Sequence, residues 1–541
     1  MKTILVILLA FAGTSLLNAQ FDSLVKYNLL ISEIMTDPTP SVGFLEEQEY
    51  LEIVNNSSIS INIQSIQINI GTKIFEPDSF WLQPDSFKVF FDIPTLKNSG
   101  DVIQIKQNNR LIHEVIYHPN MFTDGFKEKG GWSLELTDFS QPCITSGNWV
   151  ACEDLNGGTP GKANSISQII NSEPLQISNI YPIEDTVLLV QFNQPLVSIT
   201  PEEMYIPQLN LHGFTIQQSE LIISISKMDT NKVYDFILND AQNCNQYIFE
   251  PQQLQFGLPN NNAPSKIVIN EILFNPDPTG SDFVELFNYG NRIIDISQLH
   301  FTDRDAEQNL NASTPISVKP LLLLPKSYLV ITENQDWLTS QFSSTQNSSE
   351  ANLPSLNNDA DNLILITTTG TIIDELSYDE KWHYNELNST ENVSLERVNP
   401  NQPNISSNWH SASSIENFAT PGYQNSNLSQ RISTEIGFEL PYNLVSPNND
   451  GHQDLLEINY KFNSVGWTGK IDILNYEGIT IHTLSNNDLF GLTGSLYWDG
   501  ELANNTIIKA GIYALTFSCF NLNTQEKITQ KMTFYINRSL Q

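Results

Sequence analysis

The sequence predicts an all-β protein built as a string of β-sandwich domains, and three observations predict it. Residues 60–70 (SINIQSIQINI) alternate apolar and polar side chains, which is the period-two pattern of a half-buried strand. Residues 101–105 and 470–474 show the same alternation. Turn-forming residues interrupt such segments at short intervals, while long helical periodicity is missing. At 541 residues the chain is too long for one core, and about 150 residues per domain predicts three or four domains.

The composition excludes two classes of partner. Acidic residues outnumber basic residues 61 to 26, which gives a net charge of −35. Nucleic-acid binding needs clustered lysine and arginine, so the chain is not expected to bind nucleic acid. Because of its negative net charge, anionic membranes would repel the chain. Two interpretations of the acidity stay open: solubility with suppressed association, and a supply of carboxylates for divalent cations.

The first 19 residues indicate export. Lys2 supplies a positive charge, residues 4–17 are mostly apolar, and Ala19 is a small residue at which cleavage can occur. This is the pattern of a secretory signal peptide, here residues 1–19, which is too short to span a membrane. No later stretch approaches 18 continuous apolar residues, so no transmembrane segment is predicted. We therefore expect a secreted protein.

An internal repeat gives the clearest information on organisation. Five segments recur in the same order: 31–38 as 269–276, 49–55 as 282–288, 133–135 as 394–396, 148–149 as 408–409, and 159–164 as 420–425. The offset between the copies grows along the chain. The second copy therefore carries inserted loops, which we place at residues 303–314 and 343–354 because both stretches are polar and rich in turn residues.

The repeated motifs resemble those of the lamin-tail domain. Each copy has a strand ending in Glu-Ile before an Asp-Pro or Asn-Pro, then an aromatic-X-Glu-X-X-Asn segment, and a final Thr-Pro-Gly-X-X-Asn. The resemblance covers residues 27–165 and 264–428. It implies an immunoglobulin-like β-sandwich for each copy, of a kind common in exported bacterial proteins.

The remaining segments resemble two other immunoglobulin-like families. The segments 187–196 (VLLVQFNQPL), 221–225 (LIISI) and 234–238 (YDFIL) follow one another between the two copies, and residues 172–260 around them are similar to bacterial Ig-like domains. Four segments follow one another in residues 435–541: 446–454 (SPNNDGHQD), 476–478 (YEG), 498–500 (WDG) and 510–513 (AGIY). Their order looks like that of the FlgD-type Ig-like domain and of the C-terminal domains of gliding-associated proteins of Bacteroidota, which can direct export to the outer membrane. Asn449-Asp450-Gly451 stands where those families usually have Gly-Asp-Gly. The resemblance thus implies four immunoglobulin-like β-sandwich domains after the signal peptide, at the outer-membrane surface or in the extracellular space.

The repeated acids form a candidate cluster with two interpretations. Glu33, Asp37 and Glu52 recur in part as Glu271 and Glu285. Two carboxyl groups with different pKa values in a cleft could perform acid–base catalysis. These acids belong to the framework motif of a repeat, however, and polar residues beside turns usually accept hydrogen bonds from backbone amides. We favour the structural interpretation.

No enzyme is predicted. The eight histidines are scattered, and the sequence has no His-Glu-X-X-His motif, no Gly-X-Ser-X-Gly motif and no phosphate-binding loop. Trp149 and Trp409 could stack on sugars if exposed, but their equivalent positions in the repeat favour core packing.

Two further sites are predicted. Asn448, Asp450 and Asp454 surround a glycine and could bind calcium as a cofactor, although a plain Asx turn explains the same residues. Cys143 and Cys152 are close in sequence and could form a disulfide after export, with buried free cysteines as the alternative.

These features predict a non-catalytic surface or extracellular interaction protein whose modules act in adhesion, as a scaffold or as spacers. Its partner is an unidentified protein or glycan at the cell surface. The alternative is a secreted carbohydrate-binding accessory or another enzyme-associated protein. The four segments together leave no room for a catalytic domain of ordinary size.

Overall fold

The computed structural model describes residues 24–143, 147–167, 174–243, 249–260, 266–342, 345, 347–429, 436–448, 450–503 and 506–537. The predicted signal peptide lies outside these ranges. Within them, no helix has the length and hydropathy needed to cross a membrane.

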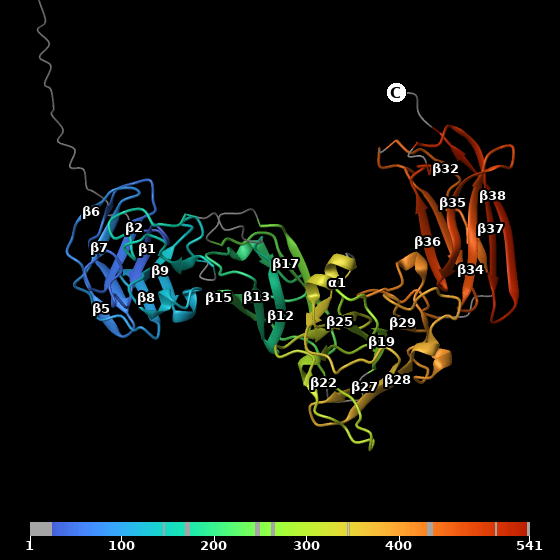
Figure 1. The fold of residues 1–541 in the computed structure, drawn as a ribbon, viewed down its shortest axis with the longest axis horizontal. Coiled ribbons are helices and arrows are strands. Elements are labelled where there is room, and N and C mark those ends of the chain that lie inside the picture. Colours follow the sequence, from blue (N-terminus) through green and yellow to red (C-terminus); the bar gives the residue numbers. More distant parts are fainter. Residues whose placement is uncertain are drawn as a thin grey trace, which may run out of the picture.

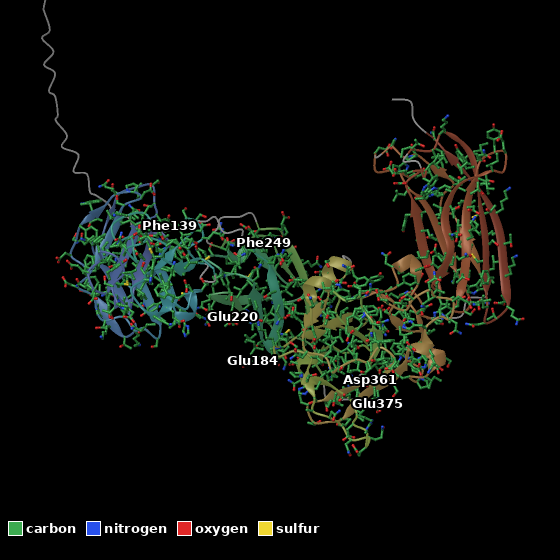
Figure 2. The ribbon with its side chains drawn as sticks, viewed as in Figure 1. Phe139, Glu184, Glu220, Phe249, Asp361 and Glu375 are labelled. Carbon is green, nitrogen blue, oxygen red and sulfur yellow. The ribbon has the colours of Figure 1, made fainter. Side chains whose placement is uncertain are left out.

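The described chain forms β-rich parts that follow one another in the order of the sequence (Figures 1 and 2). Four large apolar clusters follow one another along it. We name the parts around them the first unit (residues 24–167), the second unit (174–256), the third unit (266–429) and the fourth unit (436–537), and mean the described residues within these bounds. Each cluster is enclosed by small, mainly antiparallel sheets. The predicted fold class, a string of four immunoglobulin-like β-sandwiches, is confirmed.

The first unit packs a five-stranded sheet against a four-stranded sheet. The larger sheet consists, in spatial order, of β11 (Trp149–Ala151), β10 (Leu134–Leu136), β1 (Leu29–Met35), β2 (Tyr50–Asn55) and β7 (Phe87–Phe90). The smaller sheet consists of β5 (Lys73–Phe75), β4 (Ile66–Ile70), β8 (Asp101–Gln107) and β9 (Arg110–Tyr117), and β3 (Ile61–Asn62) pairs with β6 (Trp81–Leu82).

The third unit has the same spatial order of strands. Its larger sheet consists of β30 (Trp409–Ser411), β29 (Leu395–Arg397), β19 (Ile267–Leu273), β20 (Phe283–Asn288), β25 (Tyr328–Thr332) and the additional β26 (Ser348–Glu350). Its smaller sheet consists of β23 (Thr314–Pro315), β22 (Leu299–Thr302), β27 (Ala360–Thr367) and β28 (Ile372–Asp379), and β21 (Ile294–Asp295) pairs with β24 (Leu322–Leu323).

The additional chain of the third unit overlaps both stretches in which insertions were placed, 303–314 and 343–354, and begins before the second of them, with α1. A long loop joins β22 to β23, whereas only two residues separate β4 from β5 in the first unit. The helix α1 (Gln335–Gln341) and β26 lie between β25 and β27. One expected strand is interrupted: Ser65 has a φ of 62°, in the left-handed region, so residues 60–70 form the two strands β3 and β4.

The second and fourth units complete the β architecture. The second unit has two sheets. The four-stranded sheet consists of β12 (Ile177–Glu184), β13 (Val187–Phe192), β16 (Glu220–Ile225) and β15 (Leu211–Gln217). The three-stranded sheet consists of β14 (Met204–Tyr205), β17 (Tyr234–Leu238) and β18 (Gln252–Phe256). The fourth unit also has two sheets. The three-stranded sheet consists of β31 (Gly437–Glu439), β33 (Leu456–Lys461) and β36 (Thr493–Trp498). The five-stranded sheet consists of β32 (Leu444–Val445), β38 (Glu526–Ile536), β37 (Gly511–Asn521), β34 (Trp467–Leu474) and β35 (Thr480–Phe490).

Short 3₁₀ helices join the strands of three units. They are η1 (Pro119–Met121), η2 (Lys127–Lys129), η3 (Pro201–Glu203), η4 (Ile296–Gln298), η5 (Glu380–Trp382), η6 (Ser406–Asn408) and η7 (Ser414–Glu416).

Among the described residues, direct hydrogen bonds join neighbouring units. The hydroxyl of Tyr181 in the second unit donates to Oδ2 of Asp295 in the third unit at 3.0 Å. The backbone N–H of Leu492 in the fourth unit donates to the carbonyl of Ser426 at 2.8 Å. The third unit is therefore tied to both of its neighbours.

Candidate functional site

A row of three glutamates crosses the larger sheet of the first unit. β1 pairs with β2 and β10 so that Glu33 lies opposite Glu52 on one side and opposite Glu135 on the other. All three side chains have a relative exposure of 0%. Burying a carboxyl group is costly unless hydrogen bonds compensate for the lost water. We call these residues the first carboxylate row.

The Thr-Pro-Gly segment at residues 159–161 supplies several of the compensating donors. The backbone N–H of Thr159 donates to Oε1 of Glu33 at 2.8 Å, and that of Gly161 donates to Oε2 of Glu52 at 2.6 Å. The hydroxyl of Thr159 donates to Oε1 of Glu135 at 2.6 Å. Gly161 has a φ of 76°, a conformation that glycine adopts at little cost. The row therefore fixes the segment that ends the first unit.

Hydroxyl groups satisfy further oxygen atoms of the first carboxylate row. Ser133 and Tyr50 each donate to Oε1 of Glu33 at 2.6 Å. Ser32 donates to Oε1 of Glu52 at 2.8 Å. The carboxyl oxygens are thus used by hydrogen bonds inside the unit.

The asparagine that ends the Thr-Pro-Gly-X-X-Asn motif satisfies a bulge. The register of β1 against β2 shifts between Ile31 and Glu33, which leaves Ser32 outside the regular ladder. The side-chain amide of Asn164 donates to the carbonyl of Ser32 at 3.0 Å and to that of Leu136 at 2.8 Å. The motif therefore supplies the partner that the bulged strand lacks.

The third unit repeats the arrangement with Glu271, Glu285 and Glu396, which we call the second carboxylate row. Glu271 on β19 lies opposite Glu285 on β20 on one side and opposite Glu396 on β29 on the other, and all three are 0% exposed. The backbone N–H of Thr420 donates to Oε1 of Glu271 at 2.8 Å, and that of Gly422 donates to Oε2 of Glu285 at 2.6 Å. The same framework is therefore built twice in one chain.

In each row one threonine hydroxyl lies between two carboxyl groups. Oγ1 of Thr420 is 2.9 Å from Oε2 of Glu271 and 2.8 Å from Oε1 of Glu396. A hydroxyl carries one proton, so both contacts are hydrogen bonds only if one of the two carboxyl groups is protonated and donates to the threonine. Burial, and then the charge of Glu396, raise the pKa of Glu271 to about 8. In the first row, burial raises the pKa of Glu52 to about 8. These acids hold protons near neutral pH.

The first row also approaches a thiol, which gives it a donor set that could hold a metal. The ligand atoms of Glu33, Glu135 and Cys152 lie within 4.8 Å of one another. Burial raises the pKa of the Cys152 thiol to about 12, which disfavours the thiolate that binds metals. The third unit builds the same row with Ala412, whose N–H donates to Ser394 as that of Cys152 donates to Ser133. The row therefore forms without a thiol, and we assign it no metal.

The structure brings together four of the five acids singled out from the sequence. Glu33 contacts the same motif as Glu52, and Glu271 contacts the same motif as Glu285. Asp37 lies outside the row, because its Oδ1 accepts from Thr39 and its Oδ2 from Asn98. Sequence reasoning missed Glu135 and Glu396, although the repeated Ser-Leu-Glu segments contained them.

The predicted disulfide between Cys143 and Cys152 is wrong. Cys152 is a free, buried cysteine, and its sulfur accepts a hydrogen bond from the N–H of Asp154 at 3.3 Å. Cys143 is disulfide-bonded, and hence to a different cysteine. The physical reason is direction: Cys152 follows β11 and turns its sulfur into the carboxylate row. Cys519 is a free cysteine within the apolar cluster of the fourth unit.

The predicted calcium loop is closed by its own hydrogen bonds. The amide of Asn448 donates to Oδ2 of Asp450 at 2.9 Å. Asp454 accepts from the backbone N–H of Asn448 at 3.1 Å and from that of Gly451 at 2.7 Å. These are the contacts of Asx turns, the alternative interpretation. Calcium binding stays a prediction.

The equivalent tryptophans are core residues. Trp149 and Trp409 are each 2% exposed and belong to the apolar clusters of the first and third units. The predicted core packing is confirmed for both. Trp81, in contrast, is 64% exposed.

Comparison with solved structures gives three examples of similarity. Native α2-macroglobulin from Escherichia coli (domains MG0-NIE-MG1) shows 10% identity and a TM-score of 0.14, over 67% of this chain and 97% of that chain. PorZ, a surface component of the type-IX secretion system of Porphyromonas gingivalis, shows 12% identity and a TM-score of 0.17, over 81% of this chain and 56% of that chain. The surface-layer protein SbsC (domains 1–6) shows 10% identity and a TM-score of 0.16, over 68% of this chain and 54% of that chain.

Comparison of the sequence with curated proteins found no match. The sequence model of the lamin tail domain family matches residues 260–380. The match begins just before β19 and ends at η5, within the third unit. The match thus covers the greater part of the third unit, from before β19 to the end of β28.

Proposed function

We propose that this protein is exported and acts outside the cell as a non-catalytic interaction protein, with β-sandwich modules that serve in adhesion, as a scaffold or as spacers. The observation that carries the proposal is the use of the six glutamates in the two carboxylate rows. Each is 0% exposed and accepts hydrogen bonds from its own unit. A catalytic acid or base must reach a substrate, and these residues do not.

We further propose a division into a signal peptide (1–19), two lamin-tail-like domains (27–165 and 264–428), a bacterial Ig-like domain (172–260) and a FlgD-type or gliding-associated C-terminal domain (435–541). The identical strand order of the first and third units supports the assignment of the first copy. The C-terminal domain would take part in sorting to the outer membrane. The hydrogen bonds that tie the third unit to its neighbours suit a spacer, because a spacer must hold the units on its two sides in a fixed position.

Protease shaving of intact cells, with the culture medium assayed in parallel, tests the location. We expect peptides of this chain to be released from intact cells. Full-length or C-terminally trimmed protein in the medium would instead indicate a released factor. Protection in intact cells together with absence from the medium would refute export.

Calcium is proposed for the loop of Asn448, Asp450 and Asp454, whose oxygen-rich side chains suit a hard cation. If calcium binds there, the melting temperature of the chain rises when calcium is added and falls with a chelator. The variant Asp450→Asn/Asp454→Asn should abolish that response. A melting temperature independent of calcium leaves the loop as a plain turn.

A second candidate function, a secreted carbohydrate-binding accessory, is favoured by one specific feature. The third unit carries a groove lined by aromatic rings and lysines.

A further inference from the structure

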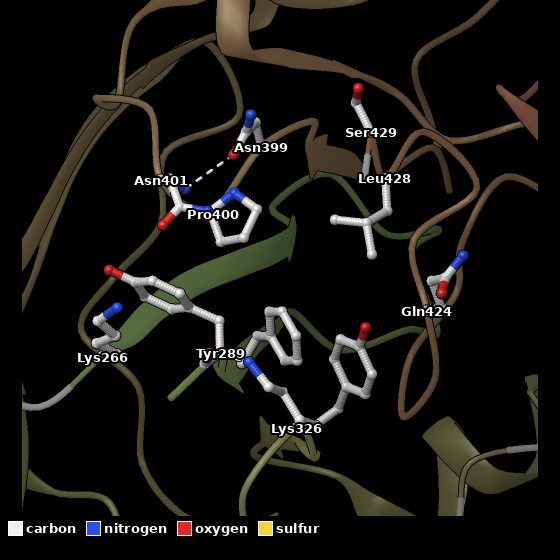
Figure 3. A pocket seen from close by; sticks show the side chains of 11 residues that line it. Lys266, Tyr289, Lys326, Asn399, Pro400, Asn401, Gln424, Leu428 and Ser429 are labelled. Atoms are coloured by element: carbon white, nitrogen blue, oxygen red, sulfur yellow. Dashed lines mark hydrogen bonds between the residues drawn. The ribbon is translucent and has the colours of Figure 1, made fainter. Parts of the chain in front are cut away.

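The groove lies on the third unit, where the ends of β20 and β25 face the loop after β29 (Figure 3). Its volume is about 650 Å³, within the range of small-molecule sites. It is lined by Lys266, Phe287, Tyr289, Lys326, Tyr328, Asn399, Pro400, Asn401, Gln424, Leu428 and Ser429.

Three aromatic rings form one wall of the groove. The rings of Phe287 and Tyr328 are stacked, with centroids 4.4 Å apart and planes inclined by 10°. Tyr289 follows, its centroid 6.5 Å from that of Phe287. Both tyrosines are half-buried. Such ring faces bind flat, partly apolar surfaces, and the C–H face of a pyranose sugar is one.

Two exposed lysines flank Tyr289. The ammonium of Lys326 donates to the backbone carbonyl of Tyr289, and that of Lys266 lies 5.6 Å from the centroid of the Tyr289 ring. Among the ion pairs of the described residues, neither lysine has a carboxylate partner. In a chain of net charge −35, these two ammonium groups make the groove locally positive. A negatively charged ligand fits this wall.

The first unit shows that the groove is not required by the fold. Asp85 takes the place of Lys326: both have positive φ, 54° and 62°, and both donate their N–H to the asparagine that ends the neighbouring strand. Asn56 takes the place of Tyr289. The ring of Phe139, labelled in Figure 2, lies 6.3 Å from that of Phe87 and packs against the core at this position. The aromatic and cationic lining is thus particular to the third unit.

We propose that this groove binds a carboxylated sugar chain. The aromatic wall receives the face of a sugar ring, the two lysines bind its carboxylate, and the amides of Asn399, Asn401 and Gln424 can each donate to and accept from hydroxyl groups. The inference rests on the proposed surface role and names the class of its partner. It would make the third unit the ligand-binding module of the chain.

An acidic peptide is a less suitable ligand for this geometry. Extended peptides usually bind by adding a strand to a free sheet edge. β20 is already paired on one side with β19 and on the other with β25. β25 pairs with β26 at Val330–Thr332, and the carbonyl of Tyr328 accepts from the side-chain amide of Asn347. The groove walls therefore offer mainly side chains to a ligand.

Calorimetric titration of the full chain tests the proposal, with tetragalacturonate as the probe and neutral cellotetraose as its uncharged counterpart. We expect tetragalacturonate to bind and cellotetraose to bind at least about tenfold more weakly. The variant Lys266→Gln/Lys326→Gln should reduce the affinity for tetragalacturonate by about tenfold, and added salt should weaken binding of the wild type. Tyr289→Ala should weaken both sugars.

Two control variants isolate the groove. Lys232→Gln removes one positive charge, from a lysine whose ammonium lies 5.0 Å from the centroid of the Tyr234 ring in the second unit, and Trp81→Ala removes an exposed aromatic ring outside the groove. Both should bind tetragalacturonate like the wild type. Since all substituted lysines are exposed, melting temperatures should stay unchanged.

Three results would overturn the proposal: no binding of tetragalacturonate, equal binding of the two sugars, or an unchanged affinity in the double variant. Tetraglutamate that binds as tightly as tetragalacturonate would overturn the sugar assignment. If shaving finds the chain on the cell surface while tetragalacturonate does not bind, the groove assignment fails and the proposed surface role stands.

Discussion

The first and third units share their strand order, yet they satisfy the same buried backbone group with different side chains. In the first unit the N–H of Ile31 donates to Nδ1 of His113 at 2.9 Å. In the third unit the N–H of Ile269 donates to Oδ2 of Asp374 at 2.9 Å, and Asp374 pairs with Arg397 at 2.8 Å. A neutral imidazole in one copy is thus replaced by an ion pair in the other. The fold fixes which backbone group needs a partner and leaves the chemistry of the partner free.

A second difference involves two positions that change together. Tyr50 donates its hydroxyl to Glu33, and a Cβ atom added to Gly158 would overlap that hydroxyl. The third unit has Phe283 in place of Tyr50 and Ala419 in place of Gly158. The methyl group of the alanine is compatible with a ring that lacks the hydroxyl. Neighbouring buried positions are therefore coupled by volume as well as by hydrogen bonds.

Glu396, at one end of the second carboxylate row, accepts more hydrogen bonds than Glu135, its equivalent in the first row. Glu396 accepts from the N–H and the side-chain amide of Asn427 at 2.9 and 2.8 Å, and Ile166 stands at the equivalent place in the first unit. Glu396 further accepts from the hydroxyl of Ser426, whose carbonyl bonds to the fourth unit. The second row thus also supports a junction.

The largest expected loss of stability comes from replacing Glu396 or Glu135, the glutamate at the corresponding end of each carboxylate row. Glu396→Ala leaves the backbone N–H groups of Ser426 and Asn427 without their acceptor and removes one of the two carboxyl groups beside the Thr420 hydroxyl. It should destabilise the third unit by about 3–5 kcal/mol. Glu135→Ala leaves fewer donors and should cost about 2–3 kcal/mol. Hydrogen exchange of peptides from β29 and from β10 measures the two units separately.

Glu307→Ala, an exposed acid in the inserted loop, is the control and should change nothing. Glu396→Ala should also speed exchange around Leu492, which Glu135→Ala should not. Equal losses in the two units would contradict the claim that the second row supports the junction.

The next effect tests the coupled pair. Gly158→Ala should destabilise the first unit by about 2–3 kcal/mol, because the new methyl group overlaps the Tyr50 hydroxyl. Tyr50→Phe alone should cost about 1 kcal/mol for the lost hydrogen bond. The double variant reproduces the third unit and should cost less than the sum, as hydrogen exchange of β1 and β2 can show. Simple additivity of the two changes would contradict the coupling.

The sequence predicted the fold because its signals are local. The alternation at 101–105 and 470–474 lies within β8 and β34, and the repeat located the insertions of the third unit. Glu33 and Glu271 were also visible, because motif spacing repeats them. What joins them to Glu135 and Glu396 is the register between strands about 100 residues apart, which no local pattern encodes.

Other features depend on the direction of a side chain. Cys143 and Cys152 are close in the chain, but the sulfur of Cys152 turns into the carboxylate row. Asp37 sits beside the same strand as Glu33 and yet lies outside the row. The groove joins Lys266 to Lys326, which are distant in sequence and carry no shared motif. Sequence position alone does not give the direction in which a side chain points.

The dependence of stability on pH should distinguish the carboxyl groups. The pKa of Glu52 is raised by burial from 4.5 to about 8, so its contribution to stability is fully present below pH 4.5 and is lost as the pH rises through about 8. Glu52→Gln does not titrate, and should remove most of the loss of stability between these pH values. Opening free energies of β2 from hydrogen exchange measure it.

The equivalent change in the third unit sharpens the comparison. Burial, and then the charge of Glu271, raise the pKa of Glu285 well above 4.5. Glu285→Gln should therefore flatten the pH dependence of β20 and leave that of β2 unchanged. A wild-type stability that does not fall between pH 4.5 and 8 would show that these acids are ionised in the folded state.

The smallest effect concerns His113, where the two units differ in kind. Burial lowers the pKa of His113 from 6.5 to about 4, so its contribution to stability is present above pH 6.5 and is lost as the pH falls through about 4. The oxygen of an asparagine can accept the same N–H of Ile31 without titrating. His113→Asn should therefore lower stability at neutral pH, and reduce the acid-induced loss in β1 by about 1–2 kcal/mol.

His118→Asn provides the matched control, because His118 is exposed and lies on the loop after the same strand. It should keep the wild-type acid response of β1. The strand β19 should be unaffected by either variant, because Asp374 and Arg397 serve it in place of an imidazole. If the stability of His113→Asn fell between pH 6.5 and 4 as steeply as that of the wild type, the imidazole would not be the group that makes the first unit sensitive to acid. The first and third units would then differ in the side chain that accepts from the backbone, but not in how their stability depends on pH.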